Sequence, residues 1–330
     1  MKPNYNFWNE LREKSRGRGE PLFVLAPMAD VTDAAFRRMF AKYGKPDVTW
    51  TEFVSADGLS SAGREILKRD LEYTEAERPI VAQLFSSTPE HMASAVALCR
   101  ELGFDGVDIN MGCPDKSIEK QGSGAAHIKD LENARDVYVA ALQAASGMPI
   151  TIKTRIGYNK PEIDTWIRGL LELKLPTLTV HLRTRKELSQ VDAHWELMPS
   201  IVELARVVSP ETLIIGNGDI KNLSDGIEKV KMSGCDGGMI GRGVFGNPFG
   251  FNSEIDFNTF TLPKRFEILL EHTRLYEELL GDIKSFSIMK KHYKAYVNGF
   301  DGAKELRVEL MDAKNSREIE EILNKFVLSL

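Results

Sequence analysis

Thiol, amine and imidazole side chains stand where short apolar runs of this sequence come to an end. Cys113 follows one such run, Lys153 and Arg155 close the next, and His181 closes the one after that, with Arg183 two residues further on. A buried strand has no packing reason to end in Lys-x-Arg or in His. Any one of these ends could be an ordinary solvated strand end. Taken together, they indicate polar and cationic groups gathered for a function, not solvated strand ends.

The elements that would position these side chains repeat along the chain. Eight short, β-branched apolar runs begin near residues 22, 48, 80, 106, 149, 177, 213 and 238. The segments between them mostly have helical apolar spacing. This alternation predicts a (β/α)8 TIM barrel, a fold that typically takes about 250 residues and keeps its functional groups at the C-terminal ends of the strands. The alternative is a doubly wound open sheet, but its G-x-G-x-x-G turn is missing after the first run, which ends in Ala26, Pro27 and Met28.

Two of the predicted strand ends are rich in glycine. The seventh run ends in Gly216-Asn217-Gly218-Asp219 and the eighth in Gly241-Arg242-Gly243. Strands 7 and 8 of such a barrel lie side by side, and their backbone N–H groups, with the helix that follows, form the usual phosphate pocket of the fold. Arg242 would add a charge-assisted contact. The sequence therefore predicts a cofactor that carries a phosphate.

The pattern changes after the predicted barrel. Residues 252–263 are polar and without a clear period, and the apolar spacing from residue 264 onward is helical. We therefore expect a barrel domain over 1–251, a linker over 252–263 and a small all-helical domain over 264–330.

Seven motifs resemble the tRNA-dihydrouridine synthases, in the order in which that family carries them. The resemblance spans most of the predicted barrel, and the helical tail (289–307) is also similar. N-x-G-C-P together with K-T-R and the downstream H-x-R-T is highly specific. The motifs are LAPMADVTD (25–33), QLF (83–85), DINMGCPDKSIEKQGSGAA (108–126), IKTRIG (152–157), HLRTR (181–185), GNGDI (216–220) and IGRGVFGNP (240–248).

The resemblance implies a flavin-dependent reduction of RNA. Such enzymes reduce the C5–C6 bond of particular uridines in tRNA with FMN, which NADPH reduces in turn. Hydride passes to C6 of the uracil, and a cysteine that Cys113 matches gives the proton to C5. A thiol with a pKa near 8.5 can give up a proton to a developing enolate, so the chemistry of the residue agrees with this role.

The resemblance also assigns the other strand-end residues. Lys153 and His181 join Cys113 as catalytic residues and would contact the flavin. Asn110, Arg155 and Arg183 are expected to hold the substrate. The remaining flavin contacts are expected from Ala26, Pro27, Met28, Gln83, Asn217, Gly218, Asp219, Gly241 and Arg242.

The sequence departs from the family pattern in three places. Leu182 replaces a glycine, the loop 187–194 is largely changed, and His127 stands where an apolar residue is usual. The loop is expected to border the RNA groove, so the sequence does not determine which uridine of tRNA is the target. None of these changes affects Cys113, Lys153 or His181.

The charge distribution decides whether RNA can bind. The net charge of −5 taken alone argues against a nucleic-acid partner, but the segment 284–307 carries six basic and two acidic residues, a local +4. Phosphate contacts depend on local cations, not on the global sum. We expect Lys290, Lys291 and Lys294 to lie on one helix over 284–300 and to contact tRNA, unless this is an ordinary solvated helix face.

Composition excludes several other classes of protein. The longest unbroken apolar run has six residues, and the first twenty residues have no apolar signal region. Three cysteines form no disulfide framework and no metal motif. We expect a cytoplasmic, monomeric protein without a metal. Two alternatives stay open, an FMN barrel reductase of a free small molecule (dihydroorotate-type) and a non-catalytic tRNA-binding protein.

Overall fold

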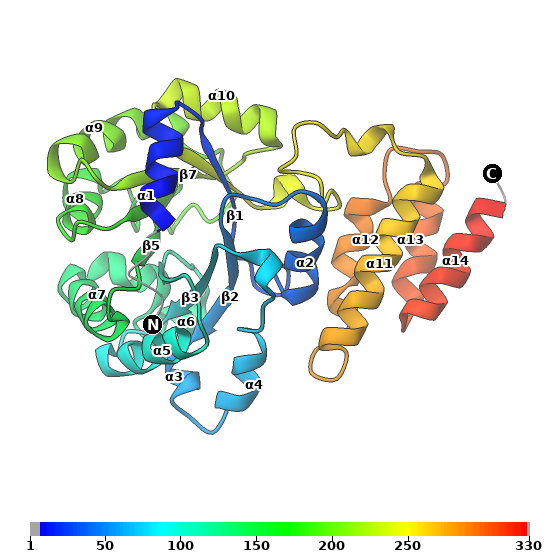
Figure 1. The fold of residues 1–330 in the computed structure, drawn as a ribbon, viewed down its shortest axis with the longest axis horizontal. Helices are drawn as coiled ribbons and strands as arrows, with labels where there is room; N and C mark the ends of the chain where they lie inside the picture. Colours follow the sequence, from blue (N-terminus) through cyan, green and yellow to red (C-terminus); the bar gives the residue numbers. More distant parts are fainter. Residues whose placement is uncertain (1–6, 329–330) are drawn as a thin grey trace.

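The computed structural model describes residues 7–328, and eight parallel strands form its centre (Figure 1). The order of neighbours is β1-β8-β7-β6-β5-β4-β3-β2, so the sheet curls round through the whole set. Two backbone hydrogen bonds join β1 to the segment before β2, from Asp47 N to Phe23 O (2.9 Å) and from Leu25 N to Val48 O (3.3 Å). The (β/α)8 barrel is therefore confirmed. Its strands are β1 (Leu22–Leu25), β2 (Thr49–Ser55), β3 (Ile80–Phe85), β4 (Gly106–Met111), β5 (Ile150–Arg155), β6 (Thr177–His181), β7 (Leu213–Asn217) and β8 (Gly237–Ile240).

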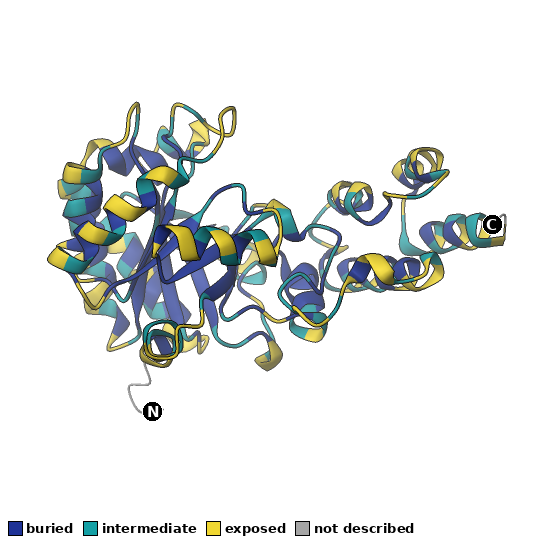
Figure 2. Cartoon of the chain, turned by 90° about the horizontal axis from the view of Figure 1, so that it is seen from above, coloured by how far each residue is buried: buried dark blue, intermediate teal, exposed yellow. Residues whose placement is uncertain are grey.

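The strands are buried on both faces because helices cover the outside of the barrel (Figure 2). Polar side chains start several of these helices. Asp33 accepts from Phe36 N, Asp130 from Asn133 N and Asn222 from Asp225 N. The helices before the tail are α1 (Phe7–Arg12), α2 (Ala34–Tyr43), α3 (Ala56–Leu59), α4 (Arg64–Arg69), α5 (Pro89–Glu101), α6 (Lys116–Glu119), α7 (Leu131–Ala145), α8 (Arg168–Leu171), α9 (Met198–Val208) and α10 (Leu223–Ser233).

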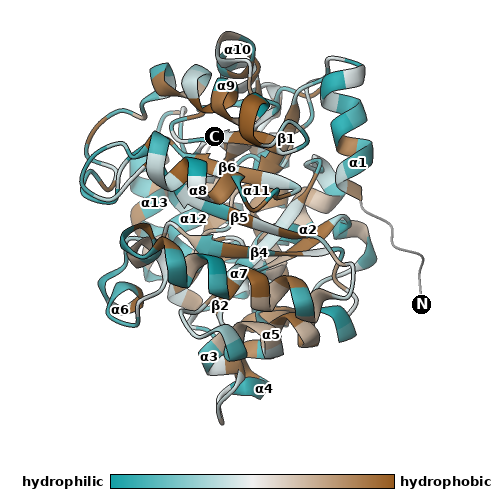
Figure 3. Ribbon diagram, turned by 90° about the vertical axis from the view of Figure 1, so that its left-hand side faces the viewer, coloured by the Kyte–Doolittle hydropathy of each residue, from teal (hydrophilic) through white to brown (hydrophobic). Residues whose placement is uncertain are grey.

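Apolar packing fills the barrel and closes one of its ends. Figure 3 shows brown, apolar stretches along the strands at the centre of the barrel. Phe7 and Trp8 of α1 are buried in a cluster with Leu22, Val24 and Trp50, at the N-terminal ends of the strands. The functional groups expected at the C-terminal ends of the strands thus lie away from this plug. No helix among residues 7–328 is long and apolar enough to span a bilayer.

Helices alone make up the tail, on one side of the barrel (Figure 1). They are α11 (Leu262–Leu280), α12 (Lys290–Tyr296), α13 (Ala303–Asp312) and α14 (Ser316–Leu328). The expectation of one helix over 284–300 is wrong, because a 3-10 turn at Phe286–Ile288 precedes α12, and α12 ends at Tyr296. The tail has an apolar core of its own, which also takes in Ala35 and Met39 of α2. The exact division at 252–263 stays a prediction.

Ion pairs join the tail to the barrel. Lys284, between α11 and α12, contacts Glu52 on β2 (2.7 Å) and Asp70 after α4 (2.9 Å). Lys42 on α2 contacts Glu271 on α11 at 2.6 Å. Lys284 is one of the six basic residues of the segment 284–307, which the sequence predicted to contact phosphates. In the structure its ammonium group is paired with barrel carboxylates instead.

Candidate active site

The strand register brings the predicted residues to one end of the barrel. Asn110 lies opposite Lys153 in the β4–β5 pair, and Arg155 lies opposite His181 in the β5–β6 pair. His181 in turn lies opposite Asn217 in the β6–β7 pair. These residues come from segments up to about a hundred positions apart, and parallel pairing places them in two neighbouring rows, Asn110 with Lys153 and Arg155 with His181 and Asn217.

Cys113 occupies a short loop directly after β4. Its backbone N–H donates to Asn110 Oδ1 (2.9 Å), and its carbonyl accepts from Ala125 N (2.9 Å). Gly124 is needed beside it, because φ is +61° there and an added Cβ would come within 2.7 Å of the Cys113 carbonyl oxygen. The side chain is half-buried, and burial raises the pKa of the Cys113 thiol. The thiol thus keeps its proton at neutral pH, which is the state required of an acid.

Lys153 lies on β5 opposite Asn110, close to the end of the strand. No hydrogen bond or ion pair joins it to any residue of the described chain. Burial, assisted by the nearby Arg155 cation, lowers the pKa of Lys153 to about 8, against the opposing effect of Asp108 and Cys113. A cation in this condition is suited to a bound anion or to a ligand that gains negative charge.

His181 is neutral and hydrogen-bonded through one ring nitrogen. Arg183 Nη1 donates to His181 Nε2 at 3.2 Å, which places the remaining ring proton on Nδ1. Burial lowers the pKa of His181 well below its ordinary value, and the cations Arg155 and Lys153 add to the effect.

Arg155 and Arg183 fix loops in this structure. Arg155 Nε donates to Gly112 O (2.8 Å), and its Nη1 donates to Thr184 O and Leu188 O (both 3.0 Å). Arg183, only 3% exposed, pairs with Asp219 and donates to Val191 O at 2.6 Å. Their expected contacts with a substrate stay predictions.

Gln83 and Asn110 form one buried chain of amides. Asn110 Nδ2 donates to Gln83 Oε1 (3.0 Å), and Gln83 Nε2 donates to Asp108 Oδ2 (2.7 Å). Sequence reasoning included Asp108 in a motif but gave it no role. Its place on a predicted central strand could have indicated a role, because a carboxylate is rarely buried there without a hydrogen-bonding or charged partner.

The glycine-containing ends of β7 and β8 leave backbone donors unused. Within residues 7–328, no acceptor takes the N–H of Gly218, Asp219 or Gly241. Gly218 has a φ of +123°, and the Asp219 carboxylate accepts from Ala193 N (2.9 Å) and Arg242 Nη2 (3.2 Å). Three free N–H groups beside an exposed arginine are suited to a phosphate.

The remaining predicted residues border this end of the barrel. Asn217 Nδ2 donates to Met239 O (2.8 Å), and Ala26 N donates to Ile240 O (2.9 Å). Pro27 is buried, and Met28 Sδ lies so near Gly241 that a Cβ there would be 3.1 Å away. Sequence reasoning missed Trp195, whose Nε1 donates to Gly218 O at 2.8 Å.

The three lysines expected on one helix all lie on α12, but their contacts differ. Lys290 Nζ donates to Met311 O at the end of α13. Lys291 and Lys294 are exposed and without a hydrogen bond or ion pair to any described residue. Their contact with RNA stays a prediction.

Two departures from the family pattern find a structural role. His127 is buried, and its Nε2 donates to Ser86 O at 3.1 Å, just after β3. Leu182 is fully buried in the barrel core. Leu182 therefore acts in packing, and His127 joins its segment to the end of β3 by a hydrogen bond.

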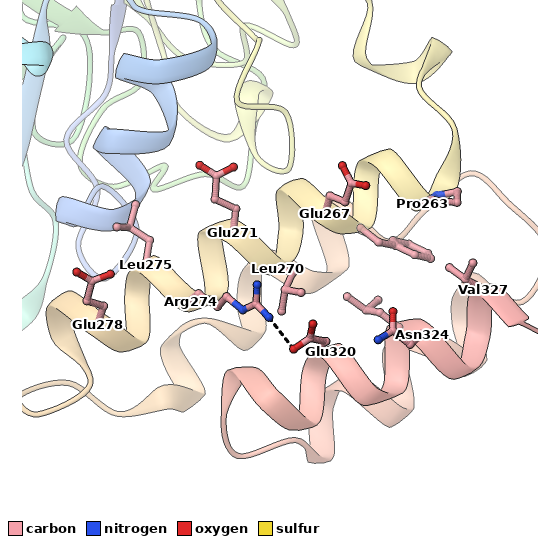
Figure 4. A pocket seen from close by; sticks show the side chains of 12 residues that line it. Pro263, Glu267, Leu270, Glu271, Arg274, Leu275, Glu278, Glu320, Asn324 and Val327 are labelled. Atoms are coloured by element: carbon pink, nitrogen blue, oxygen red, sulfur yellow. Dashed lines mark hydrogen bonds and ion pairs between the residues drawn. The ribbon is translucent and has the colours of Figure 1, made fainter.

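A groove of about 650 Å³ lies between α11 and α14, away from the strand ends (Figure 4). Leu270 and Leu323 contribute apolar surface, and Arg274 pairs with Glu320 across it at 2.6 Å. None of the predicted site residues lines this groove.

Comparison with known proteins shows which family this sequence matches. The family model described as "Dihydrouridine synthase (Dus)" matches residues 24–329. The chain is 38% identical to "Probable tRNA-dihydrouridine synthase 2" of Bacillus subtilis (strain 168), over 97% of this chain and 96% of the relative. It is 37% identical to "Probable tRNA-dihydrouridine synthase" of Staphylococcus aureus (strain MRSA252), over 97% and 95%.

Solved structures share the fold at low identity. A 6-hydroxypseudooxynicotine amine oxidase from Pseudomonas geniculata N1 matches with a TM-score of 0.53 and 11% identity, over 79% of this chain and 53% of that one. This likeness shows the fold alone, whereas the family model and the curated relatives cover nearly the whole sequence. The chain belongs to the dihydrouridine synthase family.

Proposed function

We propose that this chain is a tRNA-dihydrouridine synthase, which reduces the C5–C6 double bond of specific uridines in tRNA. The observation that carries the proposal is the pair of Cys113 and Lys153. A half-buried, protonated thiol is held by its backbone at the mouth of the barrel, and an unpartnered amine lies on the next strand. Proton donation beside a developing negative charge is the chemistry that this pair is suited to perform.

The residues present fit FMN as the cofactor. The free N–H groups of Gly218, Asp219 and Gly241, with Arg242, would hold its phosphate. Lys153 and His181 would contact the ring system, together with Gln83, Asn217 and the segment Ala26 to Met28. When bound, FMN reduced by NADPH would supply the hydride for C6 of the uracil.

The chain's own residues then complete the reduction. Cys113 Sγ would give its proton to C5, which leaves a thiolate to be reprotonated from water. Lys153, charged below its pKa of about 8, would stabilise negative charge at the ring system. His181, kept neutral by burial and by its cationic neighbours, would donate a hydrogen bond from Nδ1 without adding charge.

The proposal extends to the partners. Asn110, Arg155 and Arg183 would meet the uracil at the mouth, while Lys290, Lys291 and Lys294 would meet the tRNA backbone on the tail. The base must leave its stack to reach the mouth, so tRNA would lie along both parts of the chain. We propose a cytoplasmic monomer in which 1–251 is catalytic and 264–330 binds tRNA.

The test is to mix purified protein with FMN, NADPH and unmodified tRNA, and to measure dihydrouridine by mass spectrometry. Free uridine and dihydroorotate serve as competing substrates. Dihydrouridine in tRNA with no turnover of the free compounds is the expected result. Turnover of a free compound alone would favour a small-molecule reductase, and tRNA binding without FMN uptake would favour a non-catalytic protein.

A further inference from the structure

We infer that Asp108 is a positioning residue that sets the place of the Cys113 thiol through two buried amides; this inference deepens the proposed function and rests on it. Asp108 does not itself hydrogen-bond to Cys113. Its carboxylate lies on β4, and the contacts run from there to β3 and back to the loop after β4.

The chain of hydrogen bonds is continuous. Thr151 Oγ1 donates to Asp108 Oδ1 (2.6 Å), and Gln83 Nε2 donates to Asp108 Oδ2 (2.7 Å). Asn110 Nδ2 donates to Gln83 Oε1 at 3.0 Å. Asn110 Oδ1 finally accepts from the backbone N–H of Gly112 (3.1 Å) and Cys113 (2.9 Å).

The carboxylate fixes the direction of the whole chain. An ionised aspartate only accepts, so Gln83 must turn its NH2 toward Asp108 and its oxygen toward Asn110. Asn110 must then turn its NH2 toward Gln83 and its oxygen toward the two N–H groups. If Gln83 rotated by half a turn, two NH2 groups would face each other.

Burial restricts this chain of hydrogen bonds to one arrangement. Asp108 is 1% exposed, Gln83 is fully buried and Asn110 is 6% exposed. A partner lost there is not readily replaced by water, and an unsatisfied buried donor is costly. Because Asn110 Oδ1 holds both Gly112 and Cys113, a disordered amide would release the loop that aims the thiol.

Asp108 is thereby distinguished from a proton donor. Burial raises the pKa of Asp108 to about 6, so it is ionised at neutral pH, and both of its oxygens are already occupied by Thr151 and Gln83. Its influence must therefore pass through Gln83.

Three variants test the inference. Asp108→Leu removes the acceptor from Gln83. Asp108→Asn can restore it, with its oxygen toward Gln83 and its NH2 toward Thr151 Oγ1. Thr151→Val is the matched control, since it removes a hydrogen bond to Asp108 and leaves the Gln83 contact in place.

The readout is alkylation of Cys113 by iodoacetamide, followed by mass spectrometry in protein without flavin or tRNA. Cys99 and Cys235 are buried and serve as internal controls for unfolding. We expect Asp108→Leu to raise the Cys113 rate by about fivefold, the change for one hydrogen bond of typical net strength, while Cys99 and Cys235 stay unlabelled. Asp108→Asn and Thr151→Val should stay close to the parent protein.

The inference is overturned if Cys113 in Asp108→Leu reacts at the parent rate, or if all three cysteines become reactive together. Dihydrouridine formation per bound flavin is the second readout, and should fall about fivefold in Asp108→Leu and recover in Asp108→Asn. If the parent protein makes no dihydrouridine, the proposed function fails, and the alkylation result still decides the role of Asp108.

Discussion

Arg183 donates a hydrogen bond from its guanidinium to Nε2 of His181 at 3.2 Å, although the two residues are only two positions apart. A permanent cation at this distance stabilises the neutral imidazole and opposes its protonation. Arg183 also pairs with Asp219 and donates to Val191 O. The same side chain thus helps to keep His181 neutral, after burial, Arg155 and Lys153, and it fixes the position of the loop after β6.

Arg183→Met should raise the pKa of His181. Burial is the larger cause of the low value, so the pKa should rise and still stay below that of a free histidine. Histidine is charged below its pKa, so the acid limb of the pH–rate profile should move to higher pH. NMR titration of the His181 ring measures this, and an unchanged or lower pKa would count against the account.

The charge of Lys153 should make FMN binding depend on pH. The ammonium is present below its pKa of about 8 and is lost above it, so FMN affinity should fall as pH rises through 8. Lys153→Arg should remove this decline because arginine stays charged, and Lys153→Met should bind weakly at every pH. Fluorescence titration from pH 6 to 10 provides the measurement. An equal decline in the parent and in Lys153→Arg would contradict the assignment.

Lys291 and Lys294 should contribute to tRNA binding, with Lys290 as the internal comparison. Lys291→Gln and Lys294→Gln together should weaken binding and lower the slope of log K against log salt by about 1 per lysine. Lys290→Gln should have the smaller effect, because Lys290 is engaged by Met311 O. Filter binding over a range of salt concentrations tests this, and an equal loss in Lys290→Gln would show that the contacts lie elsewhere.

Lys284→Met should destabilise the contact between tail and barrel. The side chain is 15% exposed and satisfies two carboxylates, Glu52 and Asp70, which the variant would leave without their cation. A loss of stability is expected between about 1 kcal/mol, typical of an exposed pair, and about 3 kcal/mol, the lower value for a buried pair. Denaturant unfolding measures it. Lys284→Arg should recover part of the loss, and a Met variant as stable as the parent would refute the role.

Much of the fold could be predicted from the sequence because a buried strand produces a short run of apolar residues. Each strand is an apolar run, and the residue at its end is visible from the run alone. Cys113, Lys153 and His181 could therefore be assigned to one end of a barrel before any contact was known.

The contacts among these residues could not be predicted, since they depend on register between strands far apart in sequence. The spacing places Lys284 on one helix with Lys290, Lys291 and Lys294, yet the 3-10 turn at Phe286–Ile288 separates Lys284 from α12. Tertiary partners also take the ammonium groups of Lys284 and Lys290. Asp108 gave no signal beyond its place in a motif, because its role depends on Gln83 of another strand.

The central claim is that Cys113 gives a proton to uridine in tRNA, and one comparison tests it most directly. Parent protein and Cys113→Ala are each loaded with FMN, and two rates are measured, flavin reduction by NADPH and dihydrouridine formation in unmodified tRNA. The account predicts that Cys113→Ala keeps the first rate and loses the second. Undiminished dihydrouridine formation in Cys113→Ala, or loss of flavin binding in that variant, would contradict it.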